Sequence, residues 1–140
     1  MFDNPNVPDE IHFNVPGDRT KVKTIKPTLE LPAITQPVIV DGYTQPGSRK
    51  NTRATGAINA IPKIQLDGGA AGSDADGLVI QGISDVTIRS LVINRFDRSG
   101  IFLTSTDGSD DNRIEGNFVG TNPAGTGALG NGGTGWTSTA

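Results

Sequence analysis

The stretch that decides the fold runs from residue 77 to residue 94 and reads GLVIQGISDVTIRSLVIN. It contains three short apolar runs, at 77–80, 85–88 and 90–93, which are separated by polar corners. Apolar runs of this length, rich in β-branched residues and bounded by turn-forming residues, predict β-strands rather than a helix.

The pattern recurs in the next segment, which reads GIFLTSTDGSDDNRIEGNFV over residues 100–119. Gly77 corresponds to Gly100, 23 residues later, and Ile88 to Ile114, 26 residues later. A unit of this length with three short strands has the size of one coil of a parallel β-helix. A single coil has no closed core, whereas stacked coils share one, and this explains why the pattern repeats.

We therefore predict an all-β fold, a right-handed parallel β-helix of about three to four coils, in a single domain over 1–140. Residues 1–36 are expected to form an irregular cap with the first strands, 37–119 the repeat coils, and 120–140 a glycine-rich loop and the start of a further coil. The inward positions are expected to be Leu78, Ile80, Val86, Ile88, Leu91, Ile93, Ile101, Leu103, Ile114 and Val119. Asn117 aligns with Leu91, so its side chain is expected to turn inward with both amide functions needing partners.

The composition agrees with this fold and excludes several classes of protein. The 140 residues include 19 glycines and 9 prolines, and Ile and Val together outnumber Leu by 22 to 7, which favours turns and strands. The absence of cysteine excludes disulfides and cysteine-based metal sites. A net charge of −3 argues against nucleic-acid binding. No apolar run approaches the roughly 18 residues that span a membrane, and Met1 begins no signal-peptide pattern.

Three stretches resemble bacterial right-handed parallel β-helix repeat proteins of the pectate-lyase-like superfamily. They read IHFNVPG at 11–17, TIKPTLELPAITQPVIVDGYTQPGS at 24–48 and NRIEGNFVGTNPAGTGALGNGG at 112–133. The resemblance implies a secreted or cell-surface parent protein with more coils after the last stretch, so that the chain is expected to be a section of a longer solenoid. It implies an adhesive or glycan-contacting module, or an enzyme of the lyase or hydrolase kind.

Two acidic loops are candidates for a calcium site. The loop DGSDD at 107–111 and the loop SDAD at 73–76 both place carboxylates beside a predicted strand. Calcium takes about six to eight oxygen ligands, which clustered carboxylates and backbone carbonyls can supply. The candidate calcium ligands are Asp74, Asp76, Asp107, Asp110 and Asp111. The alternative interpretation is that Asp-Gly and Asp-Asn pairs simply form turns.

A cluster of arginines and aspartates could carry catalysis. A glycoside hydrolase needs two carboxylates. The polysaccharide lyases of the family that the chain resembles use calcium, with an arginine or lysine as base. The candidate catalytic residues are Asp97, Asp107, Asp110, Asp111, Arg95, Arg98 and Arg113. The alternative is a solvated, ion-paired corner, which is common and contributes little. His12, the single histidine, is expected on the outward face of its strand.

Two functions follow from these observations. We favour a structural or binding module of a secreted or surface protein that contacts glycans, because no complete catalytic motif is present. Its available aromatic residues are Tyr43, Phe96, Phe102 and Trp136. The alternative is a small calcium-dependent hydrolase or polysaccharide lyase, whose partner would be a glycan or a small-molecule substrate. An open final coil also predicts end-to-end or domain-swapped self-association.

Overall fold

A computed structural model describes residues 7–104 and 111–133 and confirms an all-β parallel solenoid of about four turns. The strands are β1 (Asp9–His12), β2 (Lys23–Ile25), β3 (Val38–Asp41), β4 (Ile64–Asp67), β5 (Leu78–Gln81), β6 (Thr87–Arg89), β7 (Leu91–Asn94), β8 (Ile101–Thr104), β9 (Arg113–Glu115) and β10 (Phe118–Val119). Two short 3-10 helices, η1 (Gly42–Thr44) and η2 (Gly68–Ala70), follow β3 and β4. In the described part of the chain, no helix has the length and apolar character needed to cross a membrane.

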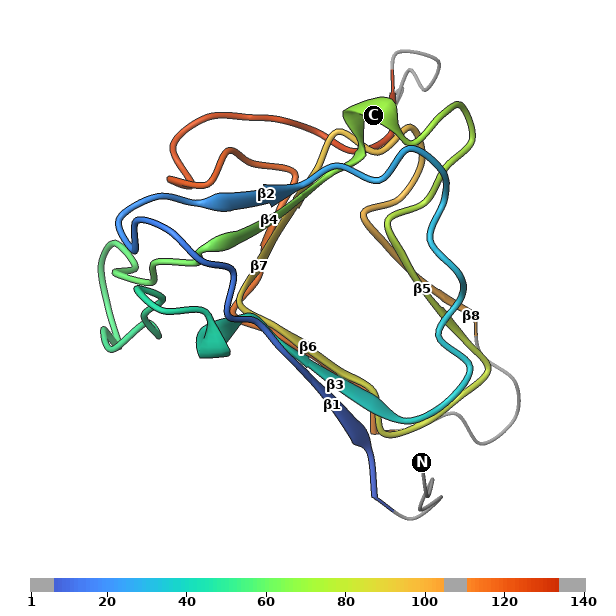
Figure 1. The fold of residues 1–140 in the computed structure, drawn as a ribbon, viewed down its shortest axis with the longest axis horizontal. Helices are drawn as coiled ribbons and strands as arrows, with labels where there is room; N and C mark the ends of the chain where they lie inside the picture. Colours follow the sequence, from blue (N-terminus) through green and yellow to red (C-terminus); the bar gives the residue numbers. More distant parts are fainter. Residues whose placement is uncertain (1–6, 105–110, 134–140) are drawn as a thin grey trace.

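The strands stack into three parallel sheets that form the sides of a triangle (Figure 1). Sheet A has the order β1-β3-β6-β9, and sheet B has the order β2-β4-β7-β10. Sheet C contains β5 and β8, and Ile34 extends it by an isolated parallel bridge to Ile80. Each turn of the chain therefore adds one strand to sheet A and one to sheet B.

The register confirms the alignment of the two sequence repeats. The pairs are Leu78 with Ile101, Ile88 with Ile114, and Ile93 with Val119. Because one coil lies on the next without a shift, inward side chains form continuous rows that share one core. The buried residues of the core are Val40, Ile64, Leu66, Ala71, Ala75, Ile80, Val86, Ile88, Leu91, Ile93 and Phe96.

One aromatic residue lies elsewhere than the sequence suggested. Phe96 is 1 % exposed and packs inside the core, so its assignment as an aromatic for glycan contact is wrong. It follows β7 at the corner between sheets B and C, where a large ring fills the angle between the two sheets. Phe102, by contrast, is 38 % exposed.

The corner between sheets A and B turns within one or two residues in the later coils. Ser90, which alone joins β6 to β7, has a φ of 56°, and Gly116 at the equivalent position has a φ of 64°. This left-handed conformation turns the chain sharply and is readily available to glycine. In the first two coils the same corner carries longer segments, 13–22 and 42–63.

Three asparagines of the last coil cap the three corners of the coil beneath it. Each side chain accepts a hydrogen bond from one backbone N–H and donates one to the carbonyl three residues earlier. Asn112 binds Val86 and Ile83 in this way, Asn117 binds Leu91 and Ile88, and Asn131 binds Phe96 and Ile93. Both amide functions of Asn117 are thus paired, as its predicted place at a corner requires.

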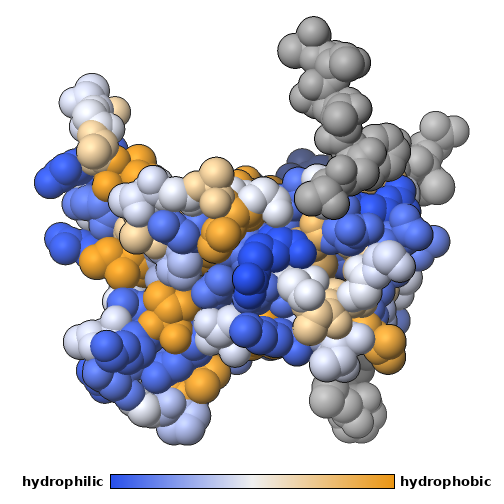
Figure 2. Space-filling view, turned by 90° about the horizontal axis from the view of Figure 1, so that it is seen from above, coloured by the Kyte–Doolittle hydropathy of each residue, from blue (hydrophilic) through white to orange (hydrophobic). Residues whose placement is uncertain are grey.

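The flank of the solenoid is mixed in character. Figure 2 shows small apolar patches separated by polar side chains on the face that it draws. The described large apolar residues with exposed side chains include several at the two ends of the coil stack, namely Ile11, Ile25, Leu103, Ile114 and Val119. Among the described residues, no further coil covers the inward positions at these two ends, and their apolar side chains are exposed.

Candidate functional site

A buried carboxylate at the end of β4 anchors the candidate site. Asp67 accepts a hydrogen bond of 2.9 Å from the Gly69 N–H and so caps the start of η2. Its two oxygens also bind the guanidinium of Arg95 from the next coil, with Nε 2.8 Å from Oδ1. The Arg95 hydrogen bond, opposed by burial and aided by the Gly69 N–H, holds the pKa of the Asp67 carboxyl below its usual value.

A groove opens beside this ion pair, and we call it the glycine groove. Its volume is about 660 Å³, and its lining residues are Gly68, Gly69, Gly72, Ser73, Arg95, Phe96, Asp97, Ala128, Leu129, Gly130 and Gly133. The segment 128–133 of the last coil forms one wall, and the corners after β4 and β7 form the rest. A cavity of this size is in the range that holds small ligands.

Two charged side chains in the groove are held in place by other contacts. The Arg95 side chain is 46 % exposed although its guanidinium is tied to Asp67. Asp97 accepts a hydrogen bond of 2.7 Å from the Asp74 N–H through Oδ2. A fixed donor and a fixed acceptor therefore face one groove, and a ligand would not have to order them.

The glycines of the groove have different reasons to be glycine. A Cβ on Gly68 would lie 2.3 Å from the Phe96 Cγ atom, so this glycine permits the close stacking of two coils. A Cβ on Gly130 would meet nothing within 4 Å. A Cβ on Gly130, which lines the groove, would therefore lie in open space.

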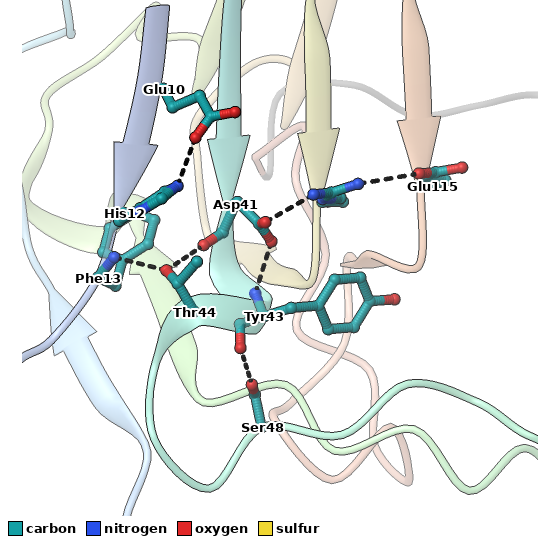
Figure 3. Close-up of polar contacts among 9 residues, drawn as sticks. Glu10, His12, Phe13, Asp41, Tyr43, Thr44, Ser48 and Glu115 are labelled. Atoms are coloured by element: carbon teal, nitrogen blue, oxygen red, sulfur yellow. Dashed lines mark hydrogen bonds and ion pairs between the residues drawn. The ribbon is translucent and has the colours of Figure 1, made fainter.

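A second polar cluster crosses the outward face of sheet A (Figure 3). One register row contains His12, Asp41, Arg89 and Glu115, one residue from each of the four strands. Arg89 lies between two acids, with its Nη2 atom 2.7 Å from Asp41 and its Nη1 atom 3.9 Å from Glu115. Burial alone would raise the pKa of the Asp41 carboxyl, but the Arg89 hydrogen bond and the Tyr43 N–H outweigh it and lower that pKa.

Tyr43 lies beside this row, and much of its ring is covered. The Lys50 Nζ atom is 5.0 Å from the ring centroid, a cation–π distance. The ring hydroxyl lies so close to Gly116 that a Cβ there would be 2.2 Å from it. Burial and the charge of Glu115 raise the pKa of the Tyr43 hydroxyl. The structure therefore gives Tyr43 a packing role, and its ring offers little free area for stacking on a sugar.

The described candidates for catalysis do not come together in one cluster. Arg95 and Asp97 line the glycine groove, while Arg98 extends toward Asp76 with 3.8 Å between Nη1 and Oδ2. Arg113 lies in β9 on sheet A, and Asp111 lies at the corner that leads into β9. Asp107 and Asp110 lie outside the described residues.

The described calcium candidates lie at opposite ends of the sheet C strands. Asp74 and Asp76 precede β5, and the Asp76 Oδ1 atom accepts a hydrogen bond of 2.8 Å from the Ser99 N–H. Asp111 comes after β8 and has the same left-handed φ of 61° as Asp85 one coil below. No group of three His, Asp or Glu side chains suited to a metal lies within 7–104 and 111–133. Calcium binding by the 107–111 loop stays a prediction.

The two Asp–Arg pairs between coils were not found from the sequence. A signal for them exists, because VDGYT at 40–44 and LDGGA at 66–70 repeat an Asp-Gly step at the end of a strand. In both, the Asp side chain accepts from the N–H two residues later and binds an arginine of the next turn. The paired residues are 48 and 28 positions apart in the sequence. No single repeat length therefore predicts which arginine binds each aspartate.

Comparison of the chain with family models, with curated proteins and with solved structures gave no match. The parallel solenoid of about four turns is the part of the family resemblance that the structure confirms. What the groove does must therefore be inferred from its own chemistry, because a fold of this kind carries many functions.

Proposed function

We propose that the chain is a binding module of a secreted or cell-surface protein, and that the glycine groove takes the hydroxyl groups of a glycan. The observation that carries this proposal is the pairing of a fixed guanidinium with a fixed carboxylate in a cavity of about 660 Å³. Secretion or surface location follows from the family resemblance and is part of the same proposal.

The chemistry of sugar hydroxyls fits this pair. Each hydroxyl is both a donor and an acceptor, so a site for neighbouring hydroxyls needs groups of both kinds. Arg95 supplies N–H donors beyond those bound to Asp67, and Asp97 supplies acceptor oxygens. The glycine walls let backbone groups approach a flat sugar ring closely, because no side chain stands between them and the ligand.

The lining of the groove supports binding over hydrolysis. Asp97 is the one carboxylate among the described lining residues, whereas a glycoside hydrolase uses two on opposite sides of the scissile bond. Asp67 does not supply the second carboxylate, because its oxygens bind Arg95 and the backbone of η2.

The test is a titration of the protein with a panel of neutral and acidic oligosaccharides. Binding is measured by calorimetry and by changes in amide chemical shifts. Gly130→Trp should abolish binding by filling the groove, and Asp97→Asn should weaken it by removing the charged acceptor. Ala54→Trp is the matched control for size, because Ala54 is exposed in a loop outside the groove. Asp85→Asn is the matched control for charge, because Asp85 lies at another corner and asparagine tolerates its left-handed φ.

Binding that both groove variants lose and both controls keep supports the proposal. No binding to any member of the panel, or equal binding by Gly130→Trp, would overturn it. Release of reducing ends or of unsaturated sugars from a bound oligosaccharide would replace it with the enzyme alternative.

A further inference from the structure

Within residues 7–104 and 111–133, the strands at the two ends of the stack have inward side chains that no further coil covers. Ile11 of β1 and Ile114 of β9 belong to the same register row as the buried Val40 and Ile88 of sheet A. Ile11 is 47 % exposed and Ile114 is 42 % exposed. Position in the stack therefore decides their exposure, since side chains of the same kind are buried one coil further in.

Sheet B ends in the same way. Ile25 of β2 and Val119 of β10 share a row with Leu66 and Ile93, and they are 39 % and 46 % exposed. Behind the first coil lies an apolar cavity of about 280 Å³ lined by residues that include Ile11 and Ile25. Side chains that project onto this end would find apolar space to enter.

We propose that the β9/β10 end of one copy binds the β1/β2 end of a second copy and continues the parallel ladders. Every strand pair of sheets A and B is parallel, and inward residues of one strand always pair with inward residues of the next. A second copy added by the same step would place Ile114 against Ile11 and Val119 against Ile25. The exposed inward rows would then be buried as they are inside the stack.

One outward row of sheet A is complementary in charge across this junction. Glu10 shares its row with Ile39, Thr87 and Arg113, so that Arg113 of one copy would face Glu10 of the next. The neighbouring row would place the Glu115 carboxylate against the His12 imidazole. In the isolated chain Glu10 and His12 are exposed and bind each other at 2.8 Å. Opposite charges directly across a ladder stabilise a strand pair, while like charges destabilise it.

Head-to-tail stacking is favoured over a two-fold contact by the triangular cross-section. A two-fold axis that placed β9 against the β9 of another copy would reverse the order of the three sides around the solenoid. The β10 strand would then lie over sheet C of the partner, and only sheet A would pair. A head-to-tail contact pairs sheet A with sheet A and sheet B with sheet B, and it leaves both outer ends free for further copies.

Sedimentation of the whole chain over a wide concentration range, at pH 7 and low salt, tests the proposal. The mass of the wild-type assembly should increase with protein concentration and exceed that of a dimer. Arg113→Glu should place two acids together at the junction, and Glu10→Arg two bases, so each variant alone should associate about tenfold more weakly. An equimolar mixture of the two variants should recover association, because the two reversed charges would again meet as an opposite pair across the junction.

Recovery in the mixture also shows that each variant is folded. Arg53→Glu, in an exposed loop, is the control and should associate like wild type. A wild-type monomer at all concentrations would overturn the proposal. Loss of association in Arg113→Glu but not in Glu10→Arg would overturn it in favour of the two-fold contact, and variants that fail to complement each other would overturn the register. The experiment needs no glycan, and its outcome is independent of binding at the glycine groove.

Discussion

Two buried aspartates are the residues that we expect to make the solenoid sensitive to acid. Asp41 and Asp67 are 7 % and 2 % exposed, and each keeps its charge because an arginine of the next turn binds it. Truncating one partner would leave the other buried or half-buried without compensation, which is costly. The same arginines also connect neighbouring turns, so that each pair ties a corner of one coil to the coil above.

The stability of the fold should fall as the pH is lowered below about 4. The pKa of both carboxyls is lower in the folded chain than in the unfolded chain. Their contribution is therefore complete above the unfolded pKa and is lost as the pH falls through the folded pKa. Melting temperatures from pH 7 to about pH 2.5 measure this. Asp67→Asn should melt lower at pH 7 but with a shallower pH dependence, and an unchanged slope would contradict the assignment.

Glycine at the first position of η1 should not be replaceable. A Cβ on Gly42 would lie 2.0 Å from the Ser90 carbonyl oxygen of the coil above. Gly42→Ala should therefore destabilise the chain by about 1–3 kcal/mol, as overpacking does. Urea denaturation measures the loss. Gly130→Ala is the matched control, because its added Cβ meets nothing within 4 Å and its stability should be that of wild type.

At the scale of the elements, asparagine side chains form hydrogen bonds between coils at the corners, where backbone-to-backbone bonds are interrupted. The Asn117 Oδ1 atom is 2.9 Å from the Leu91 N atom, and its Nδ2 atom is 2.8 Å from the Ile88 carbonyl oxygen. The strands β6 and β7 meet between these two groups, where the corner at Ser90 interrupts the sheet hydrogen bonds. The asparagine thus satisfies polar groups that neither neighbouring sheet reaches.

Asn117→Ala should cost about 1–3 kcal/mol, because it leaves a buried donor and an acceptor of the coil below without partners. Asn51→Ala, in an exposed loop, removes local hydrogen bonds only and should cost much less. Chemical denaturation compares the two variants, and hydrogen exchange should show faster exchange of the Leu91 amide in Asn117→Ala alone. Equal stability of both variants would contradict the capping role.

The repeat was predictable because coils stack without a shift, and the offset of 26 residues between Ile88 and Ile114 recurs at Ile93 and Val119. The groove was predictable only in part. Arg95 and Asp97 stood out by their charges, but the opposite wall at 128–133 follows an excursion of the chain closed by a Thr121–Ala128 bridge. An insertion of this kind breaks the repeat length, so no fixed offset in the sequence brings that wall beside the corner.

At the scale of the whole molecule, the strands of the middle turns are the most deeply buried. Strands β4 and β7 are buried along their whole length, while β1 and β9 are exposed along theirs. Each coil of a solenoid contacts only its neighbours, so an end coil has half the contacts of an inner one. Local opening is therefore expected to begin at the ends and to reach the middle last.

Hydrogen exchange at micromolar concentration should resolve this order. Amides of β4 and β7 should exchange only through global unfolding, while those of β1 and β9 should exchange faster, through local opening. Raising the concentration should slow exchange in β1 and β9 if copies stack, and the middle strands should stay unchanged. Uniform protection across all four turns would contradict the gradient.

The corner between sheets A and B also has a consequence for how such a chain can evolve. It is one residue long at Ser90, two residues long after β9, and runs over 13–22 and 42–63 in the first two turns, while the strands on either side keep their register. The length of the connection is therefore uncoupled from the cross-section of the solenoid. Insertions at this vertex can be gained, lost or exchanged by grafting without disturbing the interior, so new surface chemistry can arise on an unchanged scaffold.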